Sequence, residues 1–353
     1  MTSTNSGNLF AICRERGWDW RQVLDLRSSS NPLGPAPGVG PAIQAASELI
    51  GHYPERSPER LEEACGKAWG VPPELVLAGS GASELLHYVA RTGWQGPAAI
   101  VIPGWTQFAE VFPHALRVPL AQPEKWPQRG LLAFSQPVDP TGEEFPEFSL
   151  RHAIASREGP VLIDESYIEF TNLPSAIHLC GQHPNLLVLR SLSPFYALPG
   201  LRVGALVGSP DWINRLRRRR GPWPVSLLAE AAAAAALADK AHAERTRVLI
   251  TEERNWLLEM ISGLDALRPA ASIANFIFAA TTCPAQEICD WFLERQILLR
   301  NCTGRPGIEG EAIRFAVRTR AENKRFVAAA AEFFTGSNPN LEPSVDPDGT
   351  PSR

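Results

Sequence analysis

The sequence predicts an α/β fold: a large, mostly parallel sheet domain with helices on both faces, followed by a smaller α+β domain. The first observation is an alternation of short apolar runs with helical stretches of roughly 10 to 15 residues, which is typical of βαβ units. The second is a change of pattern beyond the alanine-rich segment Ala229–Ala238, which is strongly helical. The length of 353 residues is enough for about two domains.

The elements of the N-terminal half follow from this periodicity. Residues 1–34 are expected to pack as a segment on the small domain, and they end in a loop dense in proline and glycine. The apolar run over 76–78 predicts a short strand that leads into the loop Gly79–Ser83. Helices are expected over residues 41–50, 58–69, 84–91 and from 107 to 112, and further strands over 98–102, 131–134 and 161–163.

The C-terminal half completes both domains. Strands over 186–189 and 203–207 close the large domain, which we assign to residues 35–220. The small domain, residues 221–335, is expected to hold strands over 276–279 and 313–317 and helices over 225–260, 285–295 and 321–334. Residues 336–353 are rich in Gly, Ser, Asn, Pro and Asp, a composition that predicts a disordered tail.

Composition and charge argue against several function classes. The formal net charge is −4, so no overall field favours nucleic acid or an anionic membrane. The basic run Arg215–Arg220 fits the last turn of a helix better than an anion-binding patch. No apolar run reaches the ~18 residues of a membrane span. Six cysteines without a CxxC pair, and an N-terminus without a signal-peptide pattern, indicate a cytoplasmic protein without a metal site.

Three motifs carry candidate chemistry, and each is weak alone. Gly79–Ser83 lies between a strand and a helix, where backbone N–H groups and the helix dipole suit a phosphate. Asp164 follows a buried strand and could pair with a cationic ring nitrogen. Ser191, Ser193 and Arg202 could also hold a phosphate. An ordinary turn, a structural aspartate and a surface ion pair are the simpler interpretations.

In this order the motifs resemble those of fold-type I pyridoxal-phosphate (PLP) enzymes, the aspartate-aminotransferase superfamily. The resemblance covers residues 5–335 and is greatest to threonine-phosphate decarboxylase, a cobalamin-biosynthesis enzyme, and to histidinol-phosphate aminotransferase. Phe195–Arg202 is a very close copy of the family's stretch downstream of its lysine, and Ile313–Thr319 is similar to the substrate end of the family. It implies an aspartate-aminotransferase-like fold, PLP as cofactor, an amino acid or phosphorylated amine as small-molecule partner, a homodimer and a cytoplasmic location.

The resemblance also implies roles for individual residues. The cofactor phosphate would be bound by Gly81, Ala82, Ser83, Ser191, Ser193 and Arg202, with Tyr53 reaching the cofactor of a neighbouring subunit. The cofactor ring would meet Trp105 on its face, Asp164 at its nitrogen, and Tyr167 and Asp139 at its phenolic oxygen. The substrate would meet Asn31, Arg300 and Arg314, with Arg314 holding a carboxylate and Arg300 a phosphate.

The sequence departs from the family where the chemistry occurs. Pro194 stands in place of the lysine that forms the Schiff base with PLP; without an amine it can neither bond to the cofactor nor move a proton at the substrate. Asp139 replaces an asparagine, and an ionised aspartate would repel the phenolic oxygen unless it were protonated. Asn5 replaces the decarboxylases' histidine, and Ser226 an asparagine frequent in relatives. The sequence has four lysines, and none of them is expected at the cofactor: Lys67, Lys125, Lys240 and Lys324.

These features leave four functions open. The retained phosphate and ring residues favour a protein that binds PLP or a related phosphorylated ligand non-covalently, with ordinary Schiff-base catalysis lost. The overall resemblance favours an active aminotransferase or amino-acid-phosphate decarboxylase, against which Pro194 stands. A lysine-independent enzyme would use Tyr167, Asp139 or His87 as acid or base, although His87 fits a structural role on its helix. An inert paralogue could complete a partner subunit's site through Tyr53.

Overall fold

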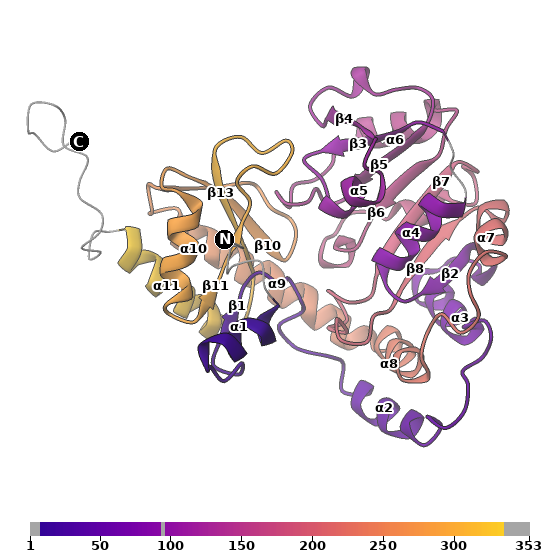
Figure 1. The fold of residues 1–353 in the computed structure, drawn as a ribbon, viewed down its shortest axis with the longest axis horizontal. Helices are drawn as coiled ribbons and strands as arrows, with labels where there is room; N and C mark the ends of the chain where they lie inside the picture. Colours follow the sequence, from indigo (N-terminus) through magenta and orange to yellow (C-terminus); the bar gives the residue numbers. More distant parts are fainter. Residues whose placement is uncertain (1–7, 93–95, 335–353) are drawn as a thin grey trace, which may run out of the picture.

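The computed structural model describes residues 8–92 and 96–334. Figure 1 shows a large lobe built on a sheet and a smaller lobe at the other end of the molecule, with helix α9 (Lys240–Ile261) running between them. The expectations for Asn5 and for residues 336–353 lie outside the described residues. Within the described ranges, no helix combines the length and the apolar character needed to cross a bilayer.

The large lobe contains a seven-stranded sheet. Its strands lie side by side in the order β2 (Val76–Gly79), β8 (Gly204–Gly208), β7 (Leu186–Ser191), β6 (Val161–Asp164), β5 (Leu131–Ser135), β3 (Ala98–Ile102) and β4 (Leu116–Pro119). All neighbouring pairs are parallel except those of β8, which runs antiparallel to both β2 and β7. The mostly parallel sheet expected from the sequence is therefore confirmed.

Helices cover both faces of this sheet, which explains why its inner strands are apolar throughout. Alternate residues of one strand enter different cores: Leu77 packs with Leu85 and Ile213 on one face, while Val76 and Ala78 join the larger core on the other. The helices of this lobe are α3 (Glu59–Trp69), α4 (Ala82–Thr92), α5 (Thr106–Val111), α6 (Glu147–Ser156) and α7 (Pro210–Arg217), with 3-10 turns η2 (Pro73–Leu75), η3 (Pro123–Lys125), η4 (Ile168–Phe170) and η5 (Ala176–Leu179).

The smaller lobe is an α+β unit around a four-stranded antiparallel sheet. Its strands lie in the order β12 (Arg300–Asn301), β13 (Glu311–Ala316), β10 (Phe276–Thr281) and β9 (Leu267–Pro269), and its helices are α10 (Ala285–Leu293) and α11 (Arg320–Phe334). The N-terminal segment joins this lobe, because β1 (Leu24–Asp25), after α1 (Leu9–Arg16), pairs in parallel with β11 (Ile297–Leu298).

Two helices lie near the boundary placed at residue 220, which remains a prediction. Helix α8 (Leu227–Ala238) follows that boundary in sequence but packs against α2 (Val39–Ser47) and α3.

The basic run Arg215–Arg220 has a structural role at two of its positions. Arg217 and Arg220 each donate to a different carboxylate oxygen of the buried Glu62 at 2.8 Å, which fastens the end of α7 to α3.

Candidate cofactor and ligand site

The predicted phosphate residues meet in space although they come from distant segments. Gly81 has a φ of +88°, and a Cβ built on it would lie 2.6 Å from Arg202 Nη2, so the glycine allows this close approach. Arg202 Nη1 donates to Ser193 Oγ at 3.3 Å, and the Ser193 N–H donates to Ser191 Oγ at 3.2 Å. Helix α4 begins beside them at Ala82. A helix N-terminus, two hydroxyls and a guanidinium form a suitable anion site.

The predicted ring residues follow the carboxyl ends of neighbouring strands, where open α/β sheets bind their ligands. Trp105 follows β3, Asp139 follows β5, and Asp164 ends β6 with Tyr167 just beyond it. The Tyr167 ring packs edge to face against Phe276 of the small lobe, with ring centroids 5.0 Å apart. Trp105 packs in the same way against Phe108, with ring centroids 5.4 Å apart. This edge of the sheet therefore gathers the aromatic and acidic groups that the sequence singled out.

Asp164 is buried, and its Oδ1 accepts hydrogen bonds from the Ser166 hydroxyl at 2.5 Å and the Ser166 N–H at 3.1 Å. Burial, which penalises the charged form, is the main reason that its pKa is raised to about 7; the Ser166 bonds oppose this rise in part. The carboxyl group thus takes up a proton readily in the ligand-free protein, and a cation placed beside it would lower its pKa and keep it ionised.

Asp164→Asn is expected to remove a loss of stability that the ligand-free wild type shows between pH 5 and pH 8. A folded-state pKa of about 7 against an ordinary value of 3.8 means that the folded form binds the proton more tightly. The wild type therefore loses stability as pH rises from about 4 to about 7, and the asparagine variant does not. Between pH 5 and 8 the variant should gain about 2 kcal/mol on the wild type, measured by urea unfolding. A difference that does not change with pH would contradict this.

Pro194 lies half-buried in the turn after β7, held by the N-terminal segment. Its carbonyl accepts the Asn31 N–H at 2.8 Å. The Asn31 side-chain amide donates to Phe195 O and Thr246 Oγ1, and its oxygen accepts the Leu33 N–H, so this predicted substrate residue is occupied by the protein itself. The chain's lysines lie exposed on α3, η3, α9 and α11, at Lys67, Lys125, Lys240 and Lys324.

Asp139 is buried between two arginines of the small lobe. Its Oδ1 accepts from Arg305 Nη2 at 2.7 Å, and its Oδ2 accepts from Arg314 Nη1 at 2.9 Å. Burial alone would raise its pKa, but the charges of Arg314 and Arg305 outweigh this and lower it. The carboxylate is therefore ionised in the folded protein, with its charge taken up by arginines. Arg305 lies outside any recognisable motif, so its role could not be predicted from the sequence.

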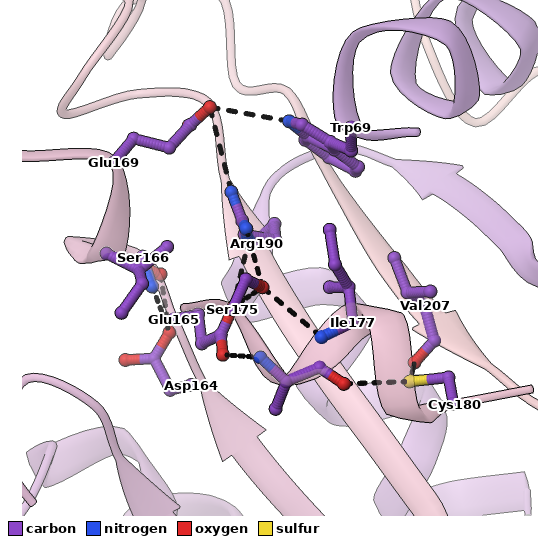
Figure 2. Close-up of polar contacts among 12 residues, drawn as sticks. Trp69, Asp164, Glu165, Ser166, Glu169, Ser175, Ile177, Cys180, Arg190 and Val207 are labelled. Carbon is purple, nitrogen blue, oxygen red and sulfur yellow. Dashed lines mark hydrogen bonds and ion pairs between the residues drawn. The ribbon is translucent and has the colours of Figure 1, made fainter. Parts of the chain in front are cut away.

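Beneath the site, a buried polar network ties β6 to β7 (Figure 2). Arg190 donates to Glu165 Oε2 at 3.2 Å and to Ser175 Oγ at 2.8 Å, and its Nη1 lies 3.6 Å from Glu169 Oε1. The Tyr196 hydroxyl donates to the same Glu169 oxygen at 2.6 Å. Since Glu165 follows Asp164 and Arg190 precedes Ser191, the network links the strand ends that carry Asp164 and Ser191.

Two other candidates are exposed side chains. Tyr53 is 81% exposed and packs on Trp223, with ring centroids 4.8 Å apart. His87 is exposed on α4, and its Nδ1 lies 2.8 Å from the Ser83 carbonyl oxygen, one turn earlier on the same helix. Among the described residues, no group of His, Cys, Asp and Glu side chains has an arrangement that could hold a metal ion.

This fold and site define a class of protein. The model of the class I and II aminotransferase family matches residues 112–329, more than half of the chain, so the chain belongs to that family, whose members are PLP-dependent. The expected α/β, aspartate-aminotransferase-like fold is confirmed by the solved structures that it resembles.

Within the family, the chain is similar to two kinds of enzyme. It is 30% identical to threonine-phosphate decarboxylase of Salmonella typhimurium over 96% of this chain and 99% of the relative. It is 33% identical to histidinol-phosphate aminotransferase of Symbiobacterium thermophilum over 87% of this chain and 89% of the relative. A solved histidinol-phosphate aminotransferase from Sinorhizobium meliloti, in complex with PLP, matches with a TM-score of 0.83 at 23% identity, covering 94% and 95% of the two chains. The predicted resemblance is confirmed.

Proposed function

We propose that this protein binds PLP or a related phosphorylated ligand non-covalently and has lost ordinary Schiff-base catalysis. The observation that carries the proposal is the grouping of the predicted phosphate residues next to Pro194. Gly81, Ser193 and Arg202 lie in contact, while the family's lysine position holds a residue without an amine. The lysines of the chain lie exposed on other elements.

The residues fit one part of the cofactor and not another. The α4 N-terminus, Ser191, Ser193 and Arg202 would hold the phosphate, and Asp164 would face the ring nitrogen, whose positive charge would keep this carboxyl ionised. PLP supplies an electron-accepting ring to an amine bonded to it. Here neither Pro194 nor the ionised Asp139 offers the amine or the hydrogen-bond donor that would engage the reactive side of that ring.

A homodimer belongs to the proposal. Exposed apolar side chains gather at the start of the chain's large lobe, where Ile50 is 71% and Tyr53 81% exposed. Covering such side chains with a second copy would remove them from water. In this arrangement Tyr53 would reach the phosphate site of the neighbouring subunit.

Arg202→Gln is expected to weaken PLP binding by roughly 10- to 100-fold, because one charge-assisted contact to the phosphate is lost. The measurement is a titration of the purified protein with PLP followed by absorbance. Borohydride treatment of a stoichiometric mixture, followed by mass spectrometry of the intact chain, should then show no covalent adduct. Arg219→Gln, at an exposed arginine outside the site, is the matched control and should bind PLP as the wild type does.

Either of two results would count against the proposal. A reducible adduct on the wild-type chain would show that another lysine has taken the role, and turnover of the parent enzyme class would become the better proposal. The absence of PLP binding would show that the phosphate site serves another ligand.

A further inference from the structure

We propose that Asp139 occupies the place of a ligand carboxylate on Arg314, so that the pocket selects a phosphorylated amine without an α-carboxylate over the corresponding amino acid. This inference rests on the proposed function, because it concerns the ligand that binds beside the phosphate site. PLP would be held by the phosphate site, whereas a second ligand would meet the arginines of the small lobe.

The hydrogen bonds of Arg314 leave no pair of donors for an incoming carboxylate. Recognition of a carboxylate by arginine normally uses two parallel N–H groups. Nη1 of Arg314 donates to Asp139, Nη2 lies 3.4 Å from the Arg27 carbonyl oxygen, and the remaining Nε is buried without a partner. Arg314 itself is 1% exposed. A second carboxylate would have to displace Asp139, or lie beside its negative charge.

The packing around Arg305 holds this arrangement in place. Arg305 reaches Asp139 from the loop between β12 and β13, and its Nη2 also lies 3.4 Å from the Gly104 carbonyl oxygen. In the same loop, Gly307 has a φ of +82°, and a Cβ built on it would lie 2.6 Å from the Pro103 nitrogen. The loop thus lies against the large lobe beside Trp105, backbone on backbone. Displacing Asp139 would therefore disturb contacts between the two lobes, in addition to moving one side chain.

Arg300 remains as the cation available to a ligand. Its half-buried side chain has no hydrogen bond or ion pair within the part of the chain that the structure describes. It lines a cavity of about 990 Å³ between the N-terminal segment, the small lobe and the turn at Pro199 and Gly200, just before Arg202. The other arginines lining this cavity each face a carboxylate: Arg21 pairs with Asp19, Arg27 with Asp25, and Arg318 with Glu322.

The charge balance favours a phosphate as the group that Arg300 receives. The charge of Arg314 is the main cause that lowers the pKa of Arg300, followed by burial, so these guanidiniums repel each other. Arg300, Arg305 and Arg314 with Asp139 leave two net positive charges, close to the charge of about −1.5 to −2 on a phosphate monoester at neutral pH. The phosphate group alone takes up this excess, so an α-carboxylate on the same ligand would find no unpaired arginine here, because Arg314 already pairs with Asp139.

Calorimetric titration of the full-length protein, without added PLP, tests the inference with two probes that differ only in the carboxylate. The wild type is expected to bind phosphoethanolamine at least ~10-fold more tightly than phosphoserine, a difference of about 1.4 kcal/mol. Asp139→Asn, which frees Arg314 with little change in shape, should tighten phosphoserine by ~10-fold or more and leave phosphoethanolamine unchanged. A wild type that prefers phosphoserine, or that binds neither probe, would overturn the inference.

Two further variants keep the test decisive. Arg300→Gln is expected to weaken both probes by the same factor, and a loss confined to phosphoserine would overturn the role given to Arg300. Arg305→Gln keeps the contact between Asp139 and Arg314 and should keep the preference, even if Asp139→Asn fails to fold. The PLP titration separates the two proposals: failure of PLP to bind removes the proposed function alone, while a preference for phosphoserine removes this inference alone.

Discussion

Pro194→Lys is expected to convert a protein without a covalent adduct into one that carries about one PLP per chain after borohydride reduction. Residue 194 directly follows Ser193 of the phosphate site, so an amine on it would lie next to bound PLP. Lysine can adopt the backbone angles that proline is confined to, and its carbonyl can still accept the Asn31 N–H. Mass spectrometry of the reduced chain, with the adduct mapped to the peptide that contains residue 194, is the measurement.

The same substitution at Pro113 is the matched control, because this proline is exposed in the large lobe and is not one of the site residues. Equal labelling of both variants would show that PLP reacts with any accessible lysine, which would contradict a site built around position 194. The loss of proline costs only about 0.4–1 kcal/mol. Turnover is not expected to return with the lysine alone, since Asp139 would still occupy Arg314.

The sequence predicted the large sheet well because its inner strands are buried on both faces and therefore read as continuous apolar runs. It missed β4, an edge strand whose Leu116 and Arg117 are exposed, because such a strand has no apolar run. It did not give the direction of β8. A cue was present: the connection from Ser191 to Gly204 contains no helix, whereas parallel neighbours need a longer crossover.

The helix expected over 225–260 is two helices. α8 ends at Ala238, and Asp239 accepts the His242 N–H at 2.8 Å as the N-cap of α9. An aspartate between two helical stretches is a recognised start signal, so this break was visible in the sequence. The alanine-rich composition on its N-terminal side concealed it, because alanine favours continuation of a helix.

The candidate site could be predicted wherever residues act through local motifs, and not where distant residues set their charge. Apart from Arg202, which precedes β8, the residues predicted to bind a phosphate end or directly follow β2 and β7, so their order along the chain is enough to group them. For Asp139, the sequence indicates a place beside the cofactor but not the groups that set its charge. Its partners Arg305 and Arg314 lie 166 and 175 residues further on, and only the fold brings them together to keep the aspartate ionised.

Arg190→Met is expected to lower the free energy of unfolding by roughly 3–5 kcal/mol, because it leaves buried carboxylates without their cation. Glu165 is 1% exposed, and Glu169 lies at the other end of the guanidinium (Figure 2). Hydrogen bonds from Ser175 and the Ala176 N–H to Glu165 remain in the variant, but they do not cancel its charge. Urea unfolding of the ligand-free protein at neutral pH measures the loss.

A matched surface arginine shows whether burial is the cause. Arg151→Met removes a partner from Glu147, whose carboxylate lies 2.8 Å away, but both side chains are more than 60% exposed, and the expected loss is below about 1 kcal/mol. Equal losses in the two variants would contradict the argument from burial. Because Arg190 also joins the ends of β6 and β7, its variant should bind PLP more weakly even where it remains folded. Unchanged PLP affinity would limit the network to stability and leave the positions of Asp164 and Ser191 to the sheet itself.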